Sequence, residues 1–323
     1  DESTRMKFRF ELEAFDRLYT KFMSEFGFHG PLKKSSVIRF HDGEEVVYKG
    51  EIWTHHGEQE GKHNAIAEAI DRHLTDYSNL DMDGYLLYGG LLQGSLYKEL
   101  AESLRYKEYC HGDLIWMYND CWPETGWTII DYYLTRKVSF YFLKRAFAHT
   151  MFILRQEDDK INVVGINETP EDISVDVEYG YVSFDGSERN TNTTTINLPA
   201  FSRRVVLTFD CCGDTSVGTH FIQAINNHDI LSAVSLRSYY RDYKFPEPAV
   251  KIVDVQRKDN LTRVTVKSDN FVPFVYLDLR DDIKLSDNYF HMLPGEERVI
   301  DVYADLEEQD IVLKTAPTKY KRQ

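Results

Sequence analysis

The sequence predicts an α/β region followed by an all-β region. In residues 1–149, helical periodicities alternate with short apolar runs, which is typical of α/β proteins. After residue 150, apolar and polar residues alternate one by one, as in the half-buried strands of antiparallel sheets. A polar segment with two prolines, residues 241–248, interrupts the second pattern. These observations divide the 323 residues into 1–149, 150–242 and 243–323.

The elements of the first region follow from the spacing of its apolar side chains. Four groups have the three- or four-residue spacing of one helix face: Phe15, Leu18, Tyr19 and Phe22; Ile66, Ala69, Ile70, His73, Leu74 and Tyr77; Leu92, Leu96, Leu100 and Leu104; Val138, Tyr141, Phe142 and Arg145. Two shorter runs lie between the helices. One ends in Phe22-Met23-Ser24-Glu25 and the other spans Leu114–Tyr118, and we expect both to be buried parallel strands.

The alternating runs of the second region predict two small β-sandwiches, over 150–242 and 243–323. The clearest strands are expected at 160–166, 173–179, 204–209, 219–225, 262–268 and 271–280.

Composition excludes several classes of protein. Asp and Glu outnumber Lys and Arg by 53 to 38, giving a net charge of −15 without a basic patch, so no nucleic-acid partner is expected. No apolar run reaches the length of about 18 residues that a membrane span needs, and the first residues do not resemble a signal peptide, so we expect a cytoplasmic protein. The four cysteines lack CxxC spacing, which predicts free, buried thiols rather than a zinc site or disulfides.

Glu25 is the first candidate for chemistry. It follows an apolar run and precedes a turn that contains Gly27. A carboxylate at a strand end faces whatever that end opens onto, and in barrel enzymes this is the catalytic face. The alternative is structural, because such a residue also caps turns or pairs with arginine.

The second candidate is a tryptophan-rich segment. Three of the four tryptophans, Trp116, Trp122 and Trp127, fall within twelve residues, next to Asn119 and Asp120. Flat aromatic faces beside amide and carboxylate groups suit a sugar, whose C–H faces stack while its hydroxyls need fixed partners. The alternative is a tryptophan-rich core beneath a loop.

Together these segments resemble the β-mannosidases of glycoside hydrolase family 2. Ser24–Phe28 looks like the nucleophile segment of that family, and Trp116–Pro123 resembles its last barrel strand and the following loop. The region Tyr88–Leu104 is similar to the final long helix of the family, and 285–296 is similar to its terminal sandwich. The resemblance implies the C-terminal part of a (β/α)8 TIM barrel followed by two immunoglobulin-like β-sandwich domains.

The resemblance also implies an activity and a role for each matching residue. The expected reaction is retaining, exo-acting hydrolysis of β-mannoside oligosaccharides without cofactor or metal, with Glu25 as the catalytic nucleophile. Trp116, Asn119 and Trp122 would line the mannose subsite. His29 stands where the family commonly has Gln, beside the nucleophile. His55 or His56 would border the active site, as would Trp53, for which packing is the alternative.

The resemblance leaves one part of the machinery outside the sequence. In the family, the acid/base glutamate follows an asparagine on an earlier strand, and none of Glu2, Glu11 or Glu13 does so. We therefore expect the rest of the barrel to come from a longer polypeptide and this chain alone to be inactive.

Three alternatives remain open at this point. One is another specificity of family 2: exo-β-glucosaminidase, endo-β-mannosidase or β-galactosidase. Another is a carbohydrate-binding module without catalysis. The last is a metal site in 55–64, which holds three His and two Glu, although its glycines interrupt any helix that would align the ligands.

Overall fold

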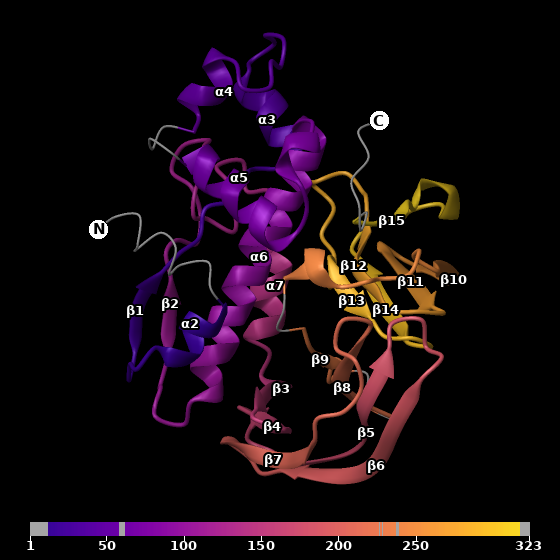
Figure 1. Cartoon of the computed structure of the whole chain (residues 1–323). Coiled ribbons are helices and arrows are strands. Elements are labelled where there is room, and N and C mark those ends of the chain that lie inside the picture. Colours follow the sequence, from indigo (N-terminus) through magenta and orange to yellow (C-terminus); the bar gives the residue numbers. More distant parts are fainter. Residues whose placement is uncertain (1–11, 58–61, 226, 228, 237–238, 317–323) are drawn as a thin grey trace.

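The computed structural model describes residues 12–57, 62–225, 227, 229–236 and 239–316. The chain first forms a helical unit that carries a small parallel sheet, and then two β-sandwiches (Figure 1). The helices of the first unit are α2 (Leu12–Arg17), α3 (Lys34–Phe40), α4 (Glu51–His55), α5 (Lys62–His73), α6 (Met82–Tyr106) and α7 (Val138–Ala146), with a 3-10 turn η1 (Tyr77–Asn79). Its strands are β1 (Met23–Phe26) and β2 (Asp113–Ile115).

Helix α6 is the central support of this unit. Asp81 caps its N-terminus, where the carboxylate accepts a hydrogen bond from the Gly84 N–H at 2.8 Å. The helix is buried along most of its 25 residues, because α2, α5 and α7 all pack on it. The helices predicted around Ile66, Leu92 and Val138 are thus confirmed as α5, α6 and α7.

Two expectations for the first region were wrong in part. The first helix ends at Arg17, and Tyr19 is 77% exposed. The Thr20 hydroxyl bonds to both the C=O and the N–H of Phe22, a local turn that competes with helix formation. Strands β1 and β2 do pair in parallel, but they are largely exposed rather than buried. In the described residues the sheet has only these two strands, so the outer edge of each strand has no neighbouring strand.

The first sandwich consists of two antiparallel sheets. One has the order β3-β4-β7 and the other β6-β5-β8-β9. Its strands are β3 (Thr150–Glu157), β4 (Lys160–Asn167), β5 (Ile173–Ser183), β6 (Arg189–Leu198), β7 (Ser202–Asp210), β8 (Gly218–Ala224) and β9 (Ala233–Ser235). Apolar side chains of both sheets, such as Val163 and Val177, meet in one buried cluster.

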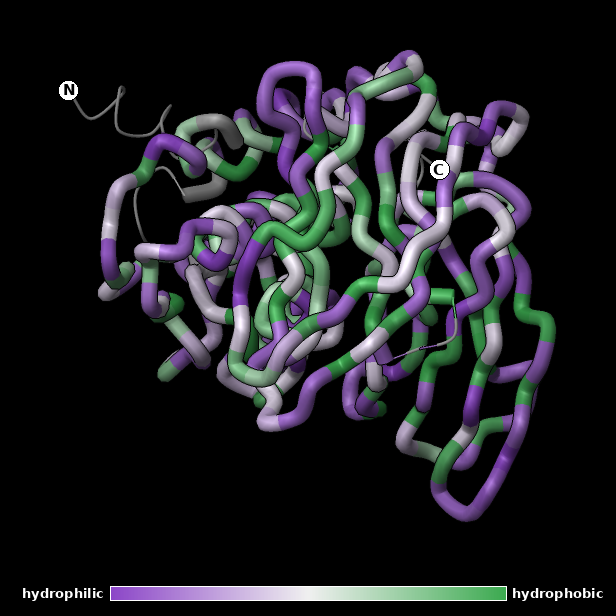
Figure 2. The backbone as a smooth tube through the Cα atoms, turned by 90° about the horizontal axis from the view of Figure 1, so that it is seen from below, coloured by the Kyte–Doolittle hydropathy of each residue, from purple (hydrophilic) through white to green (hydrophobic). Residues whose placement is uncertain are grey.

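The second sandwich pairs the sheets β10-β11-β14 and β13-β12-β15. Its strands are β10 (Val250–Lys258), β11 (Leu261–Ser268), β12 (Val272–Leu277), β13 (Phe290–Met292), β14 (Glu297–Val302) and β15 (Leu313–Thr315), with 3-10 turns η2 (Tyr240–Asp242) before it and η3 (Glu308–Asp310) within it. Figure 2 shows short bands of hydrophobic and hydrophilic colour alternating along the extended segments of the chain. All six runs predicted as strands coincide with strands of the two sandwiches.

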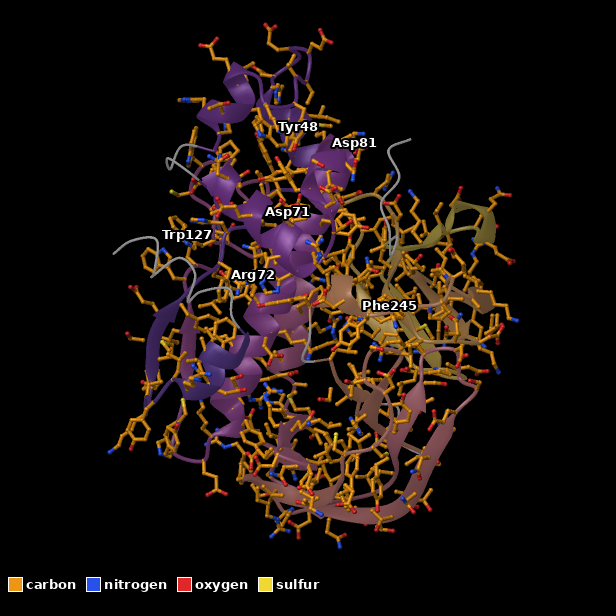
Figure 3. The ribbon with its side chains drawn as sticks, in the orientation of Figure 1. Tyr48, Asp71, Arg72, Asp81, Trp127 and Phe245 are labelled. Carbon is orange, nitrogen blue, oxygen red and sulfur yellow. The ribbon has the colours of Figure 1, made fainter. Side chains whose placement is uncertain are left out.

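The regions are joined by packing rather than by free linkers. The segment predicted to divide the sandwiches is packed, because Phe245 contacts Phe184 of the first sandwich and Phe271 of the second. Figure 3 shows Phe245 among the strands of the C-terminal half. Helix α7 belongs to the same buried cluster as the second sandwich, and Arg145 pairs with Asp287.

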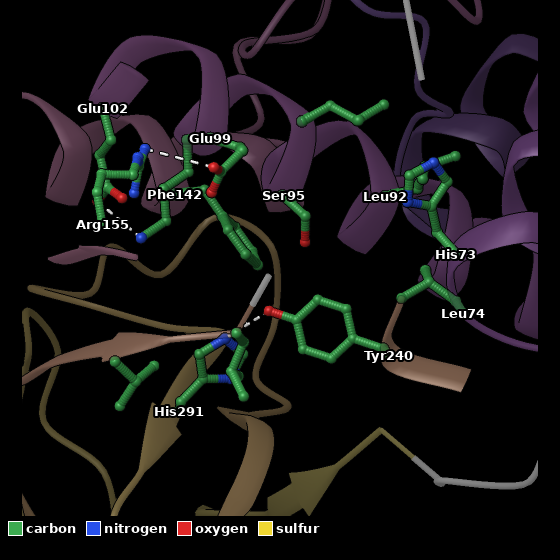
Figure 4. A pocket seen from close by; sticks show the side chains of 14 residues that line it. His73, Leu74, Leu92, Ser95, Glu99, Glu102, Phe142, Arg155, Tyr240 and His291 are labelled. Carbon is green, nitrogen blue, oxygen red and sulfur yellow. Dashed lines mark hydrogen bonds and ion pairs between the residues drawn. The ribbon is translucent and has the colours of Figure 1, made fainter. Parts of the chain in front are cut away.

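A small cavity lies where the three regions meet (Figure 4). On one side, Arg155 of β3 pairs with Glu99 of α6 at 3.3 Å. On the other side, the hydroxyl of Tyr240 and Nε2 of His291 lie 2.9 Å apart, and burial holds the pKa of His291 well below its usual value. The Arg155–Glu99 pair thus links the first sandwich to α6, and the Tyr240–His291 contact links η2 to the second sandwich.

None of the helices described in the structure is both long enough and apolar enough to span a membrane.

Candidate active site

Glu25 projects from an anchored strand into solvent. It is the third residue of β1, which pairs with β2 through Met23 opposite Asp113 and Phe26 opposite Ile115. Phe26 is buried against Tyr97 of α6, with ring centroids 5.7 Å apart, whereas Ser24 and Glu25 are exposed. The strand is therefore fixed by its last residue while its carboxylate stays accessible.

The turn after β1 requires glycine because two backbones approach closely. A Cβ atom on Gly27 would lie 2.1 Å from the carbonyl oxygen of Trp116. The Trp116 N–H in turn donates to the Phe26 carbonyl at 2.6 Å. Gly30 and Gly126 exchange backbone hydrogen bonds, so the segments that follow β1 and β2 remain paired beyond the strands.

Three buried side chains hold these two segments in place. The amide of Gln93 donates to the Phe28 carbonyl at 2.7 Å and to the Gly126 carbonyl at 3.2 Å. The Lys137 ammonium donates to the Gly30 carbonyl at 2.8 Å. The Tyr97 hydroxyl donates to the carbonyls of Trp116 and Trp127, and burial raises the pKa of Tyr97 well above its usual value. Sequence spacing gave no signal for these contacts, because Gln93 and Tyr97 lie within a long buried helix.

The segment after β2 presents the predicted sugar-binding residues. Trp116 is 51% exposed, and Asn119 is exposed with its amide 3.2 Å from the Asp120 carbonyl. Trp122 is half-buried, and its indole contacts both His55 and His56. The structure thus brings His55 and Trp122 into contact. The tryptophan-rich segment is not a buried core.

His29 and Trp127 form a second ring contact beside β1. Their ring centroids lie 4.4 Å apart, and both residues are half-buried. Figure 3 places Trp127 on the side of the molecule that carries β1 and β2. His29 therefore lies on the Glu25 side of the unit, four residues after the carboxylate.

For Trp53 the structure favours packing over substrate contact. Its side chain is 4% exposed and packs edge-on against Tyr48 and Tyr85. Sequence left both roles open. Without an accessible face, this indole has no surface on which a sugar ring can stack.

Asp120, the carboxylate predicted beside the tryptophans, is buried rather than open to a sugar. It is 3% exposed, and Oδ2 accepts a hydrogen bond from the Thr128 hydroxyl at 2.7 Å. Burial raises the pKa of Asp120 to about 6, although the Lys137 ammonium and the Thr128 hydroxyl act in the opposite direction. This buried carboxyl directly follows the exposed Asn119 in the sequence.

The metal alternative concerns residues 55–64, and the thiol prediction concerns the four cysteines. Within the described part of the chain, no group of three or more His, Cys, Asp or Glu side chains could hold a metal ion. Glu58 and Glu60, which belong to the candidate metal segment, lie outside the described residues. All four cysteines are free, but the prediction of buried thiols is confirmed only for Cys110. Cys121 is exposed on the loop after β2, and Cys211 and Cys212 are half-buried.

Known proteins of similar sequence and structure point to one class. Residues 245–316 match the family Ig_mannosidase, an Ig-fold domain. A β-mannosidase B of Thermothelomyces thermophilus is 26% identical over 90% of this chain and 38% of its own length, and one of Emericella nidulans is 22% identical over 96% and 38%. The chain thus spans about two fifths of the length of these curated relatives.

Solved structures give the same picture. A β-D-mannosidase of Dictyoglomus thermophilum superposes with a TM-score of 0.86 and 25% identity, over 96% of this chain and 39% of that one. An exo-chitosanase of Amycolatopsis orientalis has a TM-score of 0.61 and 16% identity over 88% and 40%, which shows the shared fold alone. The class that emerges from fold and sequence is the multidomain glycoside hydrolases. Within it, the chain is similar to the C-terminal portion of family 2 enzymes of the β-mannosidase type.

Proposed function

We propose that this chain carries the nucleophile half of the active site of a retaining exo-β-mannosidase. The observation that carries the proposal is the pairing of β1 with β2. This pairing sets the exposed carboxylate of Glu25 on one strand beside a neighbouring strand that leads directly into the exposed Trp116 and Asn119.

The proposed reaction is a double displacement. The Glu25 carboxylate attacks the anomeric carbon of a terminal β-mannoside, and a second carboxyl group about 5–5.5 Å away protonates the departing oxygen. In the second step this group takes a proton from water, which attacks the same carbon and releases mannose and Glu25. Trp116 and Trp122 are the candidate platforms for the sugar ring, and Asn119 is the candidate partner for its hydroxyls.

The second carboxyl group is proposed to come from the rest of a (β/α)8 barrel, of which residues 1–149 form the last part. Support comes from the unpaired outer edges of the two-stranded β1–β2 sheet among the described residues, and from relatives that are much longer than this chain. The immunoglobulin-like domains at 150–242 and 243–323, and a cytoplasmic location, are proposed together with this assignment.

A glucosamine-specific enzyme of the same family is the second candidate. It is favoured by the fold shared with the Amycolatopsis orientalis exo-chitosanase. Hydrolysis of a panel of aryl β-glycosides by the complete enzyme distinguishes the two. Faster cleavage of the β-glucosaminide or the β-galactoside than of the β-mannoside would replace the proposed specificity, and the absence of all cleavage would favour a binding module.

Trapping the covalent intermediate tests the nucleophile. A 2-fluoro-mannoside with a good leaving group should label the complete enzyme once per site, and peptide mapping should place the label on Glu25. The matched control is Glu25→Gln, which should take up no label. A label on any other residue would refute the assignment.

A further inference from the structure

We propose that His56 is a positioning residue that fixes the ring plane of Trp122, the candidate sugar platform. The proposal rests on the proposed function, in which Trp122 contacts the substrate. It adds a physical reason why this half-exposed indole holds one orientation.

The first observation is a stack of three rings. The imidazole of His56 stacks on Trp122, with ring centroids 4.7 Å apart and planes 20° from parallel. It also stacks on Phe40 of α3, at 4.1 Å and 16°. Two rings cannot share one face of an imidazole at these distances, so His56 lies between Phe40 and Trp122.

The second observation is that hydrogen bonds fix His56 to the same loop. Its Nδ1 lies 2.5 Å from the Pro123 carbonyl oxygen, and because that oxygen only accepts, Nδ1 carries the proton. The carbonyl of His56 accepts from the Thr125 N–H at 2.9 Å. The imidazole therefore cannot rotate out of the stack without breaking its bond to the residue that follows Trp122.

The far end of the stack is anchored in the core. Helix α3, which carries Phe40, is held by the Ser36 hydroxyl, which donates to the buried Asp131 carboxylate at 2.5 Å. The same helix is bound to the second sandwich, because Lys33 pairs with Asp281 at 2.8 Å. Trp122 is thus held, through His56 and Phe40, against helix α3, which is itself bound to the core and to the second sandwich.

A sugar that stacks on Trp122 gains from this arrangement because the indole needs no ordering on binding. The His55 ring also contacts the Trp122 indole edge-on, with ring centroids 5.4 Å apart and planes at 78°, and this contact restricts rotation of the indole from a second side. His56 thus acts on substrate binding through Trp122 and needs no contact with the sugar itself.

The primary test is ¹⁹F NMR of this chain labelled with 5-fluorotryptophan. Its four tryptophans give four resonances, and Trp122→Phe assigns the relevant one. In His56→Ala the Trp122 resonance should broaden or split, while that of the buried Trp53 stays in place and reports an intact fold. In His56→Phe the ring is retained without the Nδ1 donor, and a single line should return. His149→Ala, which removes an exposed histidine elsewhere, should change nothing.

Phe40→Leu gives an independent variant. It removes one ring of the stack but leaves both hydrogen bonds of His56, so a weaker broadening of the Trp122 line is expected. An unchanged Trp122 line in both His56→Ala and Phe40→Leu overturns the proposal. So does equal broadening in His56→Ala and His56→Phe, because the ring would then have no role.

Kinetics of the complete enzyme link the stack to the substrate. The interaction free energy of one aromatic pair corresponds to about a twofold to tenfold change in a dissociation constant. His56→Ala should therefore raise KM for an aryl β-mannoside by about that factor. The kcat value should change less than about twofold, because the platform holds ground state and transition state alike. A broadened Trp122 line with an unchanged KM would overturn the role in substrate binding. If the unsubstituted complete enzyme does not hydrolyse mannosides at all, the proposed function itself is refuted.

Discussion

The two kinds of sheet in this molecule are built differently. In the sandwiches, each sheet covers the other, and every residue of β12 is buried. In the helical unit, β1 and β2 form a sheet whose uncovered residues include Glu25 and Leu114, the latter 55% exposed. Helix α6 supports the inner side of that sheet through Phe26 and Tyr97. We therefore expect the sandwiches and helices to contribute most of the stability, and the proposed chemistry to lie on a sheet that contributes less.

The largest expected effect that tests this comparison is on activity. Glu25→Gln should lower turnover of the complete enzyme by at least about a thousandfold, because the amide cannot form the glycosyl intermediate. The free energy of unfolding should stay within about 0.5 kcal/mol, since the side chain is exposed. Steady-state kinetics and urea unfolding measure the two quantities. A stability loss above about 2 kcal/mol would mean that Glu25 is structural.

The reverse behaviour is expected for Phe221 in the first sandwich. Its ring is fully buried with Phe184 and Phe271, so Phe221→Ala should lower the free energy of unfolding by about 3–5 kcal/mol. Chemical denaturation of this chain provides the measurement. At temperatures where the variant is folded, kcat of the complete enzyme should be unchanged. A large fall in kcat there would show that the two regions are coupled.

A medium effect is expected at Asp120, where the site meets the core. Because burial raises its folded-state pKa to about 6 from the ordinary 3.8, the folded chain binds the proton more tightly than the unfolded chain does. Stability from this group is therefore greatest at low pH and is lost as pH rises through about 6. Relative to Asp120→Asn, the wild type should lose about 1–3 kcal/mol between pH 4 and pH 7.

The quantity to measure is the difference in unfolding free energy between the wild type and Asp120→Asn. This difference isolates Asp120, because burial also raises the pKa of Asp113 to about 6 and both carboxyls titrate in the same pH window. Urea unfolding at several pH values gives it. A difference that does not change with pH would show that the carboxyl has its ordinary affinity for protons.

The smallest effect is expected at Leu114 on β2. Leu114→Ser should change the free energy of unfolding by less than about 0.5 kcal/mol, although the residue is apolar and lies within a strand. The matched variant in a sandwich is Val177→Ser, at a fully buried position of β5, which should destabilise by several-fold more. Similar losses at the two positions would contradict the comparison.

Much of the fold could be predicted because its elements have strong local periodicity. The apolar spacing around Leu92 and Val138 and the alternation around Val177 correspond to α6, α7 and β5. The exposure of β1 and β2 could not be predicted from their apolar residues, which favoured burial. Burial depends on whether a second layer covers the strand, which a single run of residues does not encode.

The candidate site was predictable only at the level of segments. Glu25, Trp116 and Asn119 were identifiable because their neighbours resemble a known family, and they are exposed as a substrate site requires. The supports were not identifiable. Lys137 and Gln93 act through backbone carbonyls far away in sequence, and a carbonyl leaves no mark in the residue pattern.

The shared core of α7 and the second sandwich has a consequence during synthesis. The side chains that cover α7, among them Phe274 and Tyr289, are made more than 100 residues after it, and the last strands of that sandwich follow later still. At about 5–20 residues per second, the ribosome needs roughly 8 to 30 seconds to advance the 150 or so residues from α7 to the end of β14. Throughout this interval the part of α7 that packs on the second sandwich lacks its complete native partner, although α6 has already been made. The nascent chain should therefore be a substrate for chaperones until its C-terminal sandwich emerges.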